Sequence, residues 1–204
     1  HYFEENGAPA VSISALMRVH GYVTRLLLKR TVTILYGINE VDLHDQVEND
    51  GFEPSPFMVL YHFNIGYPLL SECAKLLLPT QKVTPRTQHA ADNAAQSPEI
   101  TSPAAGYEEM GYYHDLKADE NGWASAGIYN EKEHLGLKIL YDKQNLDHFV
   151  QWKMLAKGTY VMGLEPCNAT INGMADAREN GTLKTILPGE KKHMHLKLSI
   201  FEEL

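Results

Sequence analysis

Short runs of alternating or continuous hydrophobic residues follow one another along most of the chain, as is typical of β-strands. Residues 41–47 alternate apolar and polar with a period of two, and the turn signal Asn49-Asp-Gly51 follows them. Residues 26–36 are rich in β-branched and aromatic residues and stop at Gly37. Later runs of the same character cover residues 57–63, 74–78, 123–129, 135–141, 149–154, 159–164 and 195–201. Short strands separated by Gly, Pro, Asn or Asp predict a mainly β, antiparallel sandwich or barrel.

Helical signal is scarce. Residues 175–180, which end at Gly181, predict one or two helical turns. Residues 89–106 are rich in Ala, Ser, Pro, Asn and Gln and nearly free of large apolar side chains. We predict that they form a surface loop or lid and not a domain boundary. The sequence is therefore expected to form a single domain over residues 1–204.

Composition and charge exclude several classes of function. The formal net charge of −8 argues against nucleic-acid binding, which needs a basic face. The apolar runs are far shorter than the roughly 20 residues of a membrane span. Cys73 and Cys167 are too few and too far apart for a disulfide framework, which favours free thiols and a cytoplasmic location.

Two titratable side chains stand in apolar, strand-like runs about a hundred residues apart. In residues 57–63, alternation places Leu60, His62 and Asn64 on one face, so that His62 and Asn64 can point together into a cavity. In residues 159–165, Gly163 and Glu165 share a face, and the glycine leaves space where a ligand could approach the carboxylate. Burial would raise the pKa of Glu165 toward the range of a general base. The simpler alternatives are a buried histidine bonded to a backbone carbonyl and a glutamate at a solvated rim.

Other polar residues are weaker candidates. Gln151 and Asn168 offer amides that can bond hydroxyl groups, and the aromatic rings of Trp152, Tyr61 and Tyr113 suit the apolar face of a sugar. Arg86, His114 and Lys153 are further candidates for binding, with solvated or structural roles as the alternative. His193 and His195 lie two residues apart, a spacing that can ligate a metal, but the sequence shows no third ligand near them. We therefore expect no metal site and no cofactor.

Several longer segments together resemble a known family. They are residues 60–70 (LYHFNIGYPLL), Tyr113-His-Asp115, Gln151-Trp-Lys-Met154 and residues 158–168 (GTYVMGLEPCN). These motifs, with those at residues 45–49 and 187–190, are similar to an uncharacterised, aldose 1-epimerase-like branch of the galactose mutarotase-like proteins. The resemblance covers about residues 26–201. It implies an antiparallel β-supersandwich with a sugar pocket on one concave sheet.

The resemblance also implies roles for individual residues. His62, which precedes Phe63 and Asn64, is similar in setting to the family's general acid, although the spacing of its motif differs. Glu165 is placed like the general base, and Asn64, Arg86, His114, Gln151, Lys153 and Asn168 are the expected substrate-binding residues. The implied activity is that of an aldose 1-epimerase that acts on a small-molecule sugar without a cofactor. Family members are usually longer, so we expect about the C-terminal two-thirds of a longer chain, or its ordered part.

Two alternatives stay open at this point. The first is a carbohydrate-binding or regulatory module that has the pocket but no turnover. The second is a metal-dependent sugar isomerase or lyase in which His62, His114 and Glu165 hold a divalent ion. Neither the identity of the sugar nor the oligomeric state follows from the sequence.

Overall fold

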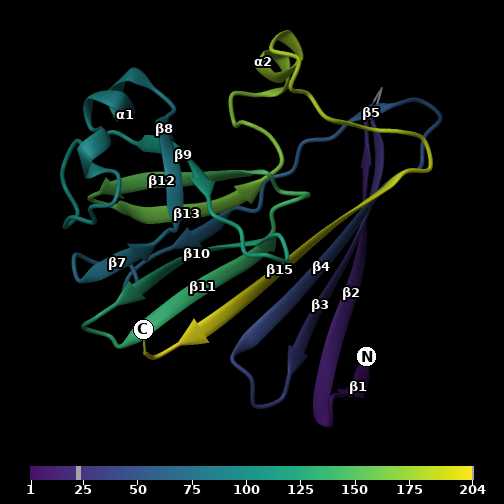
Figure 1. The fold of residues 1–204 in the computed structure, drawn as a ribbon, viewed down its shortest axis with the longest axis horizontal. Coiled ribbons are helices and arrows are strands. Elements are labelled where there is room, and N and C mark those ends of the chain that lie inside the picture. The colour runs from purple at the N-terminus through teal and green to yellow at the C-terminus, as the bar shows by residue number, and fades with distance from the viewer. Residues whose placement is uncertain (22–23, 204) are drawn as a thin grey trace.

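The computed structural model describes residues 1–21 and 24–203, and these residues fold mainly as antiparallel β-structure. An eight-stranded sheet contains, in spatial order, β1 (Tyr2–Glu5), β2 (Ala8–His20), β3 (Arg25–Leu35), β4 (Glu40–Asn49), β15 (Lys191–Phe201), β11 (Leu135–Asp142), β10 (Trp123–Asn130) and β7 (Ala74–Leu77). Figure 1 shows these strands as a twisted sheet across the molecule. The expected mainly β fold is confirmed.

A five-stranded sheet packs against one end of the larger one (Figure 1). Its strands, in spatial order, are β6 (Phe63–Ile65), β13 (Thr159–Cys167), β12 (His148–Ala156), β9 (Met110–Leu116) and β8 (Thr80–Pro85). Two short strands, β5 (Ser55–Pro56) and β14 (Thr185–Ile186), form a separate pair. The two sheets enclose a common core because strands of both direct alternate apolar residues inward, among them Leu196, Ile139, Phe149 and Leu164.

The described residues form three short helical segments: α1 (Gln88–Asp92), the 3₁₀ turn η1 (Ala94–Gln96) and α2 (Met174–Glu179). The helix expected at residues 175–180 is confirmed as α2. No helix of the described residues is long and apolar enough to cross a membrane.

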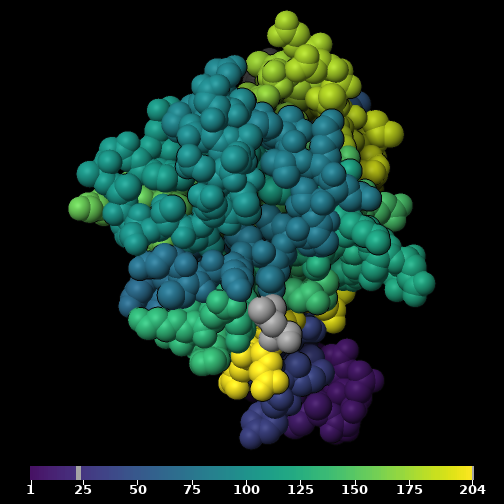
Figure 2. Space-filling model, turned by 60° about the vertical axis from the view of Figure 1, so that its left-hand side comes forward, coloured from purple at the N-terminus to yellow at the C-terminus, as the bar shows by residue number. Residues whose placement is uncertain are grey.

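The first two strands were not predicted. In Figure 2 the N-terminal strands protrude from the lower end of the body. Ile13 and Met17 lie on this projecting region and are largely exposed. Their exposure explains why β2 lacks the clear hydrophobic-in, polar-out pattern that identifies a half-buried strand.

Two other predictions need correction. Of the strand predicted at residues 57–63, only Phe63 lies in a strand, β6, and residues 57–62 form only an isolated bridge between Leu60 and Cys167. Residues 89–106 lie mostly at the surface, as expected for a surface loop, but they are not irregular throughout. They contain α1 and η1, and side chains from the five-stranded sheet hold their backbone: Gln151 donates to the Ser97 carbonyl and Lys153 to the Gln96 carbonyl.

Candidate active site

His62 and Glu165 lie side by side on the outer face of the five-stranded sheet. The distance from His62 Nε2 to Glu165 Oε1 is 3.0 Å. The angles at this contact do not make it a hydrogen bond, so Oε1 is a buried carboxylate oxygen without a hydrogen-bond partner among the described residues. The Glu165 side chain is 2% exposed, whereas that of His62 is 43% exposed. The pair thus joins a buried carboxylate to an imidazole that solvent or a ligand can reach.

Burial sets the protonation of Glu165. Desolvation of the carboxylate raises its pKa from 4.5 to about 7, and the positive charge of Arg86 partly opposes this rise. A carboxylic acid with a pKa near neutrality can gain and lose a proton readily, which is what general acid–base catalysis requires. Gly163 makes room for the group, because a Cβ atom at residue 163 would lie 2.2 Å from Oε1.

Strand register places two other predicted residues on the same face. Asn64 is paired with Gly163 across β6 and β13, so its side chain points to the same side as Glu165. Arg86 follows β8 and bonds through its backbone to Gly111, and its side chain crosses that glycine. A Cβ on residue 111 would be only 3.3 Å from Arg86 Cδ, so the glycine allows the guanidinium group to lie along the sheet.

Aromatic side chains complete this face. The ring of Trp152 meets that of His62 edge-on, with 5.6 Å between centroids, and its Nε1–H donates to Glu109 at 2.9 Å. Tyr113 lies on the same face and bonds Asn172 and the Ile171 backbone in the loop that leads to α2. Sequence reasoning missed Glu109, and no pattern around it distinguishes it from other surface glutamates.

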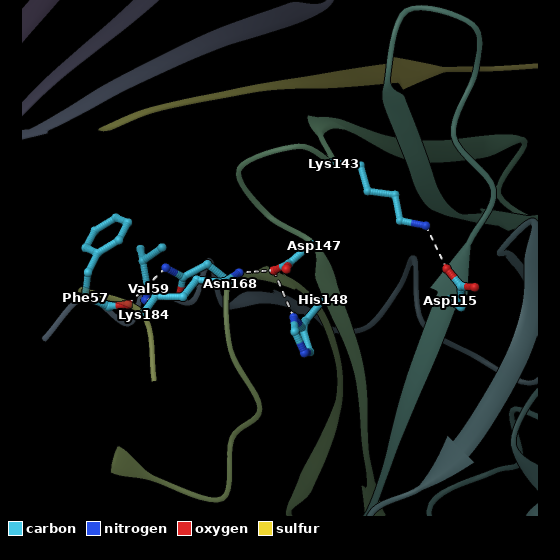
Figure 3. A network of polar contacts seen from close by, with 8 residues as sticks. All are labelled: Phe57, Val59, Asp115, Lys143, Asp147, His148, Asn168 and Lys184. Carbon is cyan, nitrogen blue, oxygen red and sulfur yellow. Dashed lines mark hydrogen bonds and ion pairs between the residues drawn. The ribbon is translucent and has the colours of Figure 1, made fainter. Parts of the chain in front are cut away.

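The segment that carries His62 is fixed from both sides. Asn168 is buried; its Oδ1 accepts from the Val59 amide at 2.7 Å, and its Nδ2 donates to the Phe57 carbonyl at 3.1 Å (Figure 3). Tyr61 faces the core, where its hydroxyl donates to Asp45 at 2.6 Å. Asn168 and Tyr61 were expected to contact the sugar. Their positions instead assign them to holding residues 57–61.

A cluster of charged side chains lies next to the segment that Asn168 holds. Asp147 contacts both His148 and Lys184 (Figure 3). Burial tends to raise the pKa of Asp147, but the hydrogen bonds from His148 and Lys184 dominate and lower it to about 2. Lys184 also accepts the Phe57 amide at its backbone carbonyl, so the cluster anchors the start of the same segment. On β9, Asp115 pairs with Lys143 at 2.7 Å (Figure 3).

Three predicted binding residues lie on the opposite face of the sheet. Gln151 and Lys153 alternate with Trp152 on β12 and are buried against residues 96–97. His114 is also buried; one ring nitrogen contacts Gln151 Oε1 at 2.9 Å and the other contacts Thr80 at 3.0 Å. Because these polar groups are already bonded inside the protein, their geometry does not support contact with a ligand beside Glu165. It also rules out a metal held jointly by His62, His114 and Glu165.

A family model described as a domain of unknown function, DUF4432, matches residues 2–200. No curated protein matches the chain. A solved structure from Klebsiella pneumoniae subsp. pneumoniae MGH 78578, named provisionally as an aldose 1-epimerase, is 23% identical with a TM-score of 0.91. It is matched over 97% of this chain and 52% of its own.

Two more distant structures have the same fold. A galactose mutarotase-like protein from Clostridium acetobutylicum has a TM-score of 0.69 at 14% identity, over 99% of this chain and 65% of its own. A protein of Escherichia coli K12, also named provisionally as an aldose 1-epimerase, has a TM-score of 0.65 at 13% identity, over 98% and 67%. The chain thus spans about half to two thirds of the length of these structures. It belongs to the DUF4432 family and has the β-sandwich fold of the galactose mutarotase-like proteins.

Proposed function

We propose that the chain carries the acid–base site of an aldose 1-epimerase, an isomerase that interconverts sugar anomers. The 3.0 Å contact between His62 Nε2 and the buried Oε1 of Glu165 is the observation that carries this proposal. The names of the structural relatives support a sugar as the substrate.

The reaction needs an acid and a base close to one another. The ring oxygen and the anomeric hydroxyl of a sugar are bonded to the same carbon, so groups that act on both must converge on a small region. His62 and Glu165 meet that requirement from two separate segments of the chain. Two widely separated groups could not serve both oxygens in one bound geometry.

In the proposed mechanism Glu165, as the carboxylate, removes the proton from the anomeric hydroxyl. His62, as the imidazolium, gives a proton to the ring oxygen while the bond between that oxygen and C1 breaks. The resulting aldehyde turns about the C1–C2 bond, and closure on the other face of the carbonyl gives the opposite anomer. Glu165 then returns its proton to the new hydroxyl and His62 recovers its own, so the protein ends as it began. No cofactor enters these steps.

The surrounding side chains supply binding groups for a hydroxylated ring. Arg86 donates hydrogen bonds to oxygen atoms and holds a positive charge near Glu165. Asn64 adds an amide on the same face, and Trp152 offers an indole ring, held by Glu109, for the apolar side of a sugar.

We also propose that residues 1–204 act as one domain, because both sheets contribute to one core. The free thiols of Cys73 and Cys167 support a cytoplasmic location.

Replacing Glu165 with glutamine tests the proposal. We expect the rate of anomer interconversion, followed by polarimetry or NMR exchange on a panel of aldoses, to fall by about 10²–10⁴-fold. Glu131→Gln is the matched control, because Glu131 is exposed and pairs with Lys75 on the eight-stranded sheet. An undiminished rate in Glu165→Gln would exclude this residue as the base. Saturable sugar binding without turnover in the unaltered protein would instead favour a binding module.

A further inference from the structure

Three histidines gather on the outer face of the eight-stranded sheet, away from the candidate active site. His195 on β15 is paired directly with His44 on β4, and His193 lies two residues away on the same face of β15. The intervening Met194 points into the core. The sequence shows only the pair His193 and His195. The pairing of β4 with β15 adds the third imidazole, from about 150 residues earlier in the chain.

The spacing of the rings matches that of imidazoles that share one metal ion. His193 Nδ1 and His44 Nε2 are 3.2 Å apart. Two nitrogens that are each roughly 2.0–2.1 Å from a tetrahedral zinc ion are about 3.3 Å apart, and the centroids of their rings are about 5 Å apart. The centroids of His44 and His193 are 5.3 Å apart, and those of His44 and His195 are 5.7 Å apart.

A carboxylate orients one of these imidazoles in the way that metal ligands commonly require. Asp42 Oδ2 lies 2.8 Å from His195 Nε2 and accepts its proton. In a neutral ring this leaves the lone pair on Nδ1. Metal-bound histidines usually donate a hydrogen bond from the N–H of their second ring nitrogen to a carboxylate or carbonyl in this manner.

The adjoining cavity has a charge that suits a cation. Its volume is about 640 Å³, and its lining includes the carboxylates of Glu5, Glu40 and Asp42 beside His44 and His195. The one ammonium group of the lining, that of Lys197, already contacts Glu40 at 3.0 Å. The carboxylates therefore outnumber the ammonium groups around the histidines.

We propose that His44, His193 and His195 bind a divalent transition-metal ion of the zinc class, with Asp42 as the positioning residue of His195. In the described part of the chain no three His, Cys, Asp or Glu side chains already converge on one point. Binding thus requires the imidazoles to turn about their side-chain torsions. The exposed His44 and His193 have the freedom to do so, and water completes the coordination. This site does not depend on the proposed epimerase activity.

Calorimetric titration of the tag-free protein with zinc chloride tests the site, since an affinity tag would add histidines of its own. We expect one saturable ion per chain. His44→Ala and His193→Ala should each weaken binding at least tenfold, and Asp42→Asn should weaken it about 10–100-fold. His20→Ala is the matched control: His20 is an exposed histidine on β2, and its removal should leave the affinity unchanged.

Cobalt(II) supplies a readout that does not depend on affinity alone. Imidazole-bound cobalt in a four-coordinate site gives intense visible absorption, which should be present in the unaltered protein and lost in His193→Ala. Circular dichroism of each variant establishes that its fold is retained. The proposal is overturned if zinc shows no saturable binding, or if His44→Ala and His193→Ala bind as tightly as His20→Ala. The three residues would then be no more than a hydrogen-bonded surface cluster.

Discussion

Replacement of Gly163 with alanine should displace the proposed base while leaving the fold intact. A Cβ at this position would lie 2.2 Å from Glu165 Oε1, whereas ordinary contacts begin at 3.4 Å. The carboxylate oxygen must therefore retreat by about 1 Å, and a displacement of this size in a reacting group costs about 10²-fold in rate. That loss corresponds to about 2.7 kcal/mol of transition-state stabilisation.

The effect on stability should be small by comparison. The atom that must yield most is the far end of a side chain, and the neighbouring Trp152 Cβ, at 3.1 Å, needs to give by a few tenths of an ångström. Alanine also lowers the conformational entropy of the unfolded chain, which stabilises a protein by roughly 0.4–1 kcal/mol where the backbone permits it. We thus expect a variant with a nearly unchanged unfolding midpoint and a strongly reduced rate.

Gly136→Ala provides a matched control in the other sheet. Its Cβ would meet the Phe201 ring, also at 2.2 Å, and that ring stacks on Tyr129 away from the candidate site. This variant should lower the unfolding midpoint and leave the rate per folded molecule unchanged. Anomer exchange by NMR and thermal unfolding by circular dichroism measure both quantities. Full activity in Gly163→Ala would refute the view that the position of the Glu165 carboxylate governs the rate.

The remaining predictions concern pH and the support of the site. Because the folded protein raises the pKa of Glu165 from 4.5 to about 7, the unfolded chain loses this proton first as the pH rises, so the stability of the protein falls between about pH 4.5 and 7. Glu165→Gln should remove that fall and stabilise the protein by up to about 3 kcal/mol at neutral pH, measured by urea titration. The rate should decline below about pH 7 as the base becomes protonated, and a flat profile would contradict its role. Tyr61→Phe should cost about 1–3 kcal/mol of unfolding free energy, because Asp45 loses a buried donor. Asn168→Ala should reduce both the stability and the rate, whereas a loss of stability alone would show that residues 57–59 do not position His62.

Much of the fold could be predicted from the sequence, because hydrophobic periodicity reports burial. The predicted runs at residues 123–129 and 135–141 became β10 and β11 with nearly the same bounds. Residues 1–21 could not be interpreted in this way, since β2 projects beyond the packed core. The run at residues 57–63 was mistaken for a strand because it is almost continuously apolar, although only Phe63 belongs to a strand and residues 57–62 form only an isolated bridge at Leu60.

The site was predictable only where strand alternation placed a small or amide neighbour on the same face as the titratable residue. Asn64 and Gly163 marked the correct faces for His62 and Glu165. The same rule, applied to β12, separates Trp152 from Gln151 and Lys153, which point into the protein. What alternation cannot supply is which strands pair. The juxtaposition of His44 with His195 comes from the pairing of β4 with β15, and that of His62 with Glu165 from the course of residues 57–62 beside β13.

The irregular course of residues 57–62 has a consequence for the chemistry. A regular strand would hold His62 through a continuous ladder, but here the segment is held at separate points. Asn168 fixes its beginning, the Tyr61 amide donates to the Pro166 carbonyl at 2.9 Å, and the Tyr61 hydroxyl reaches Asp45 in the other sheet. Glu165 directly precedes Pro166, so the backbone that orients the imidazole is bonded next to the residue that carries the carboxylate. Any shift of β13 therefore moves both groups together, which preserves the 3.0 Å contact on which the proposed reaction depends.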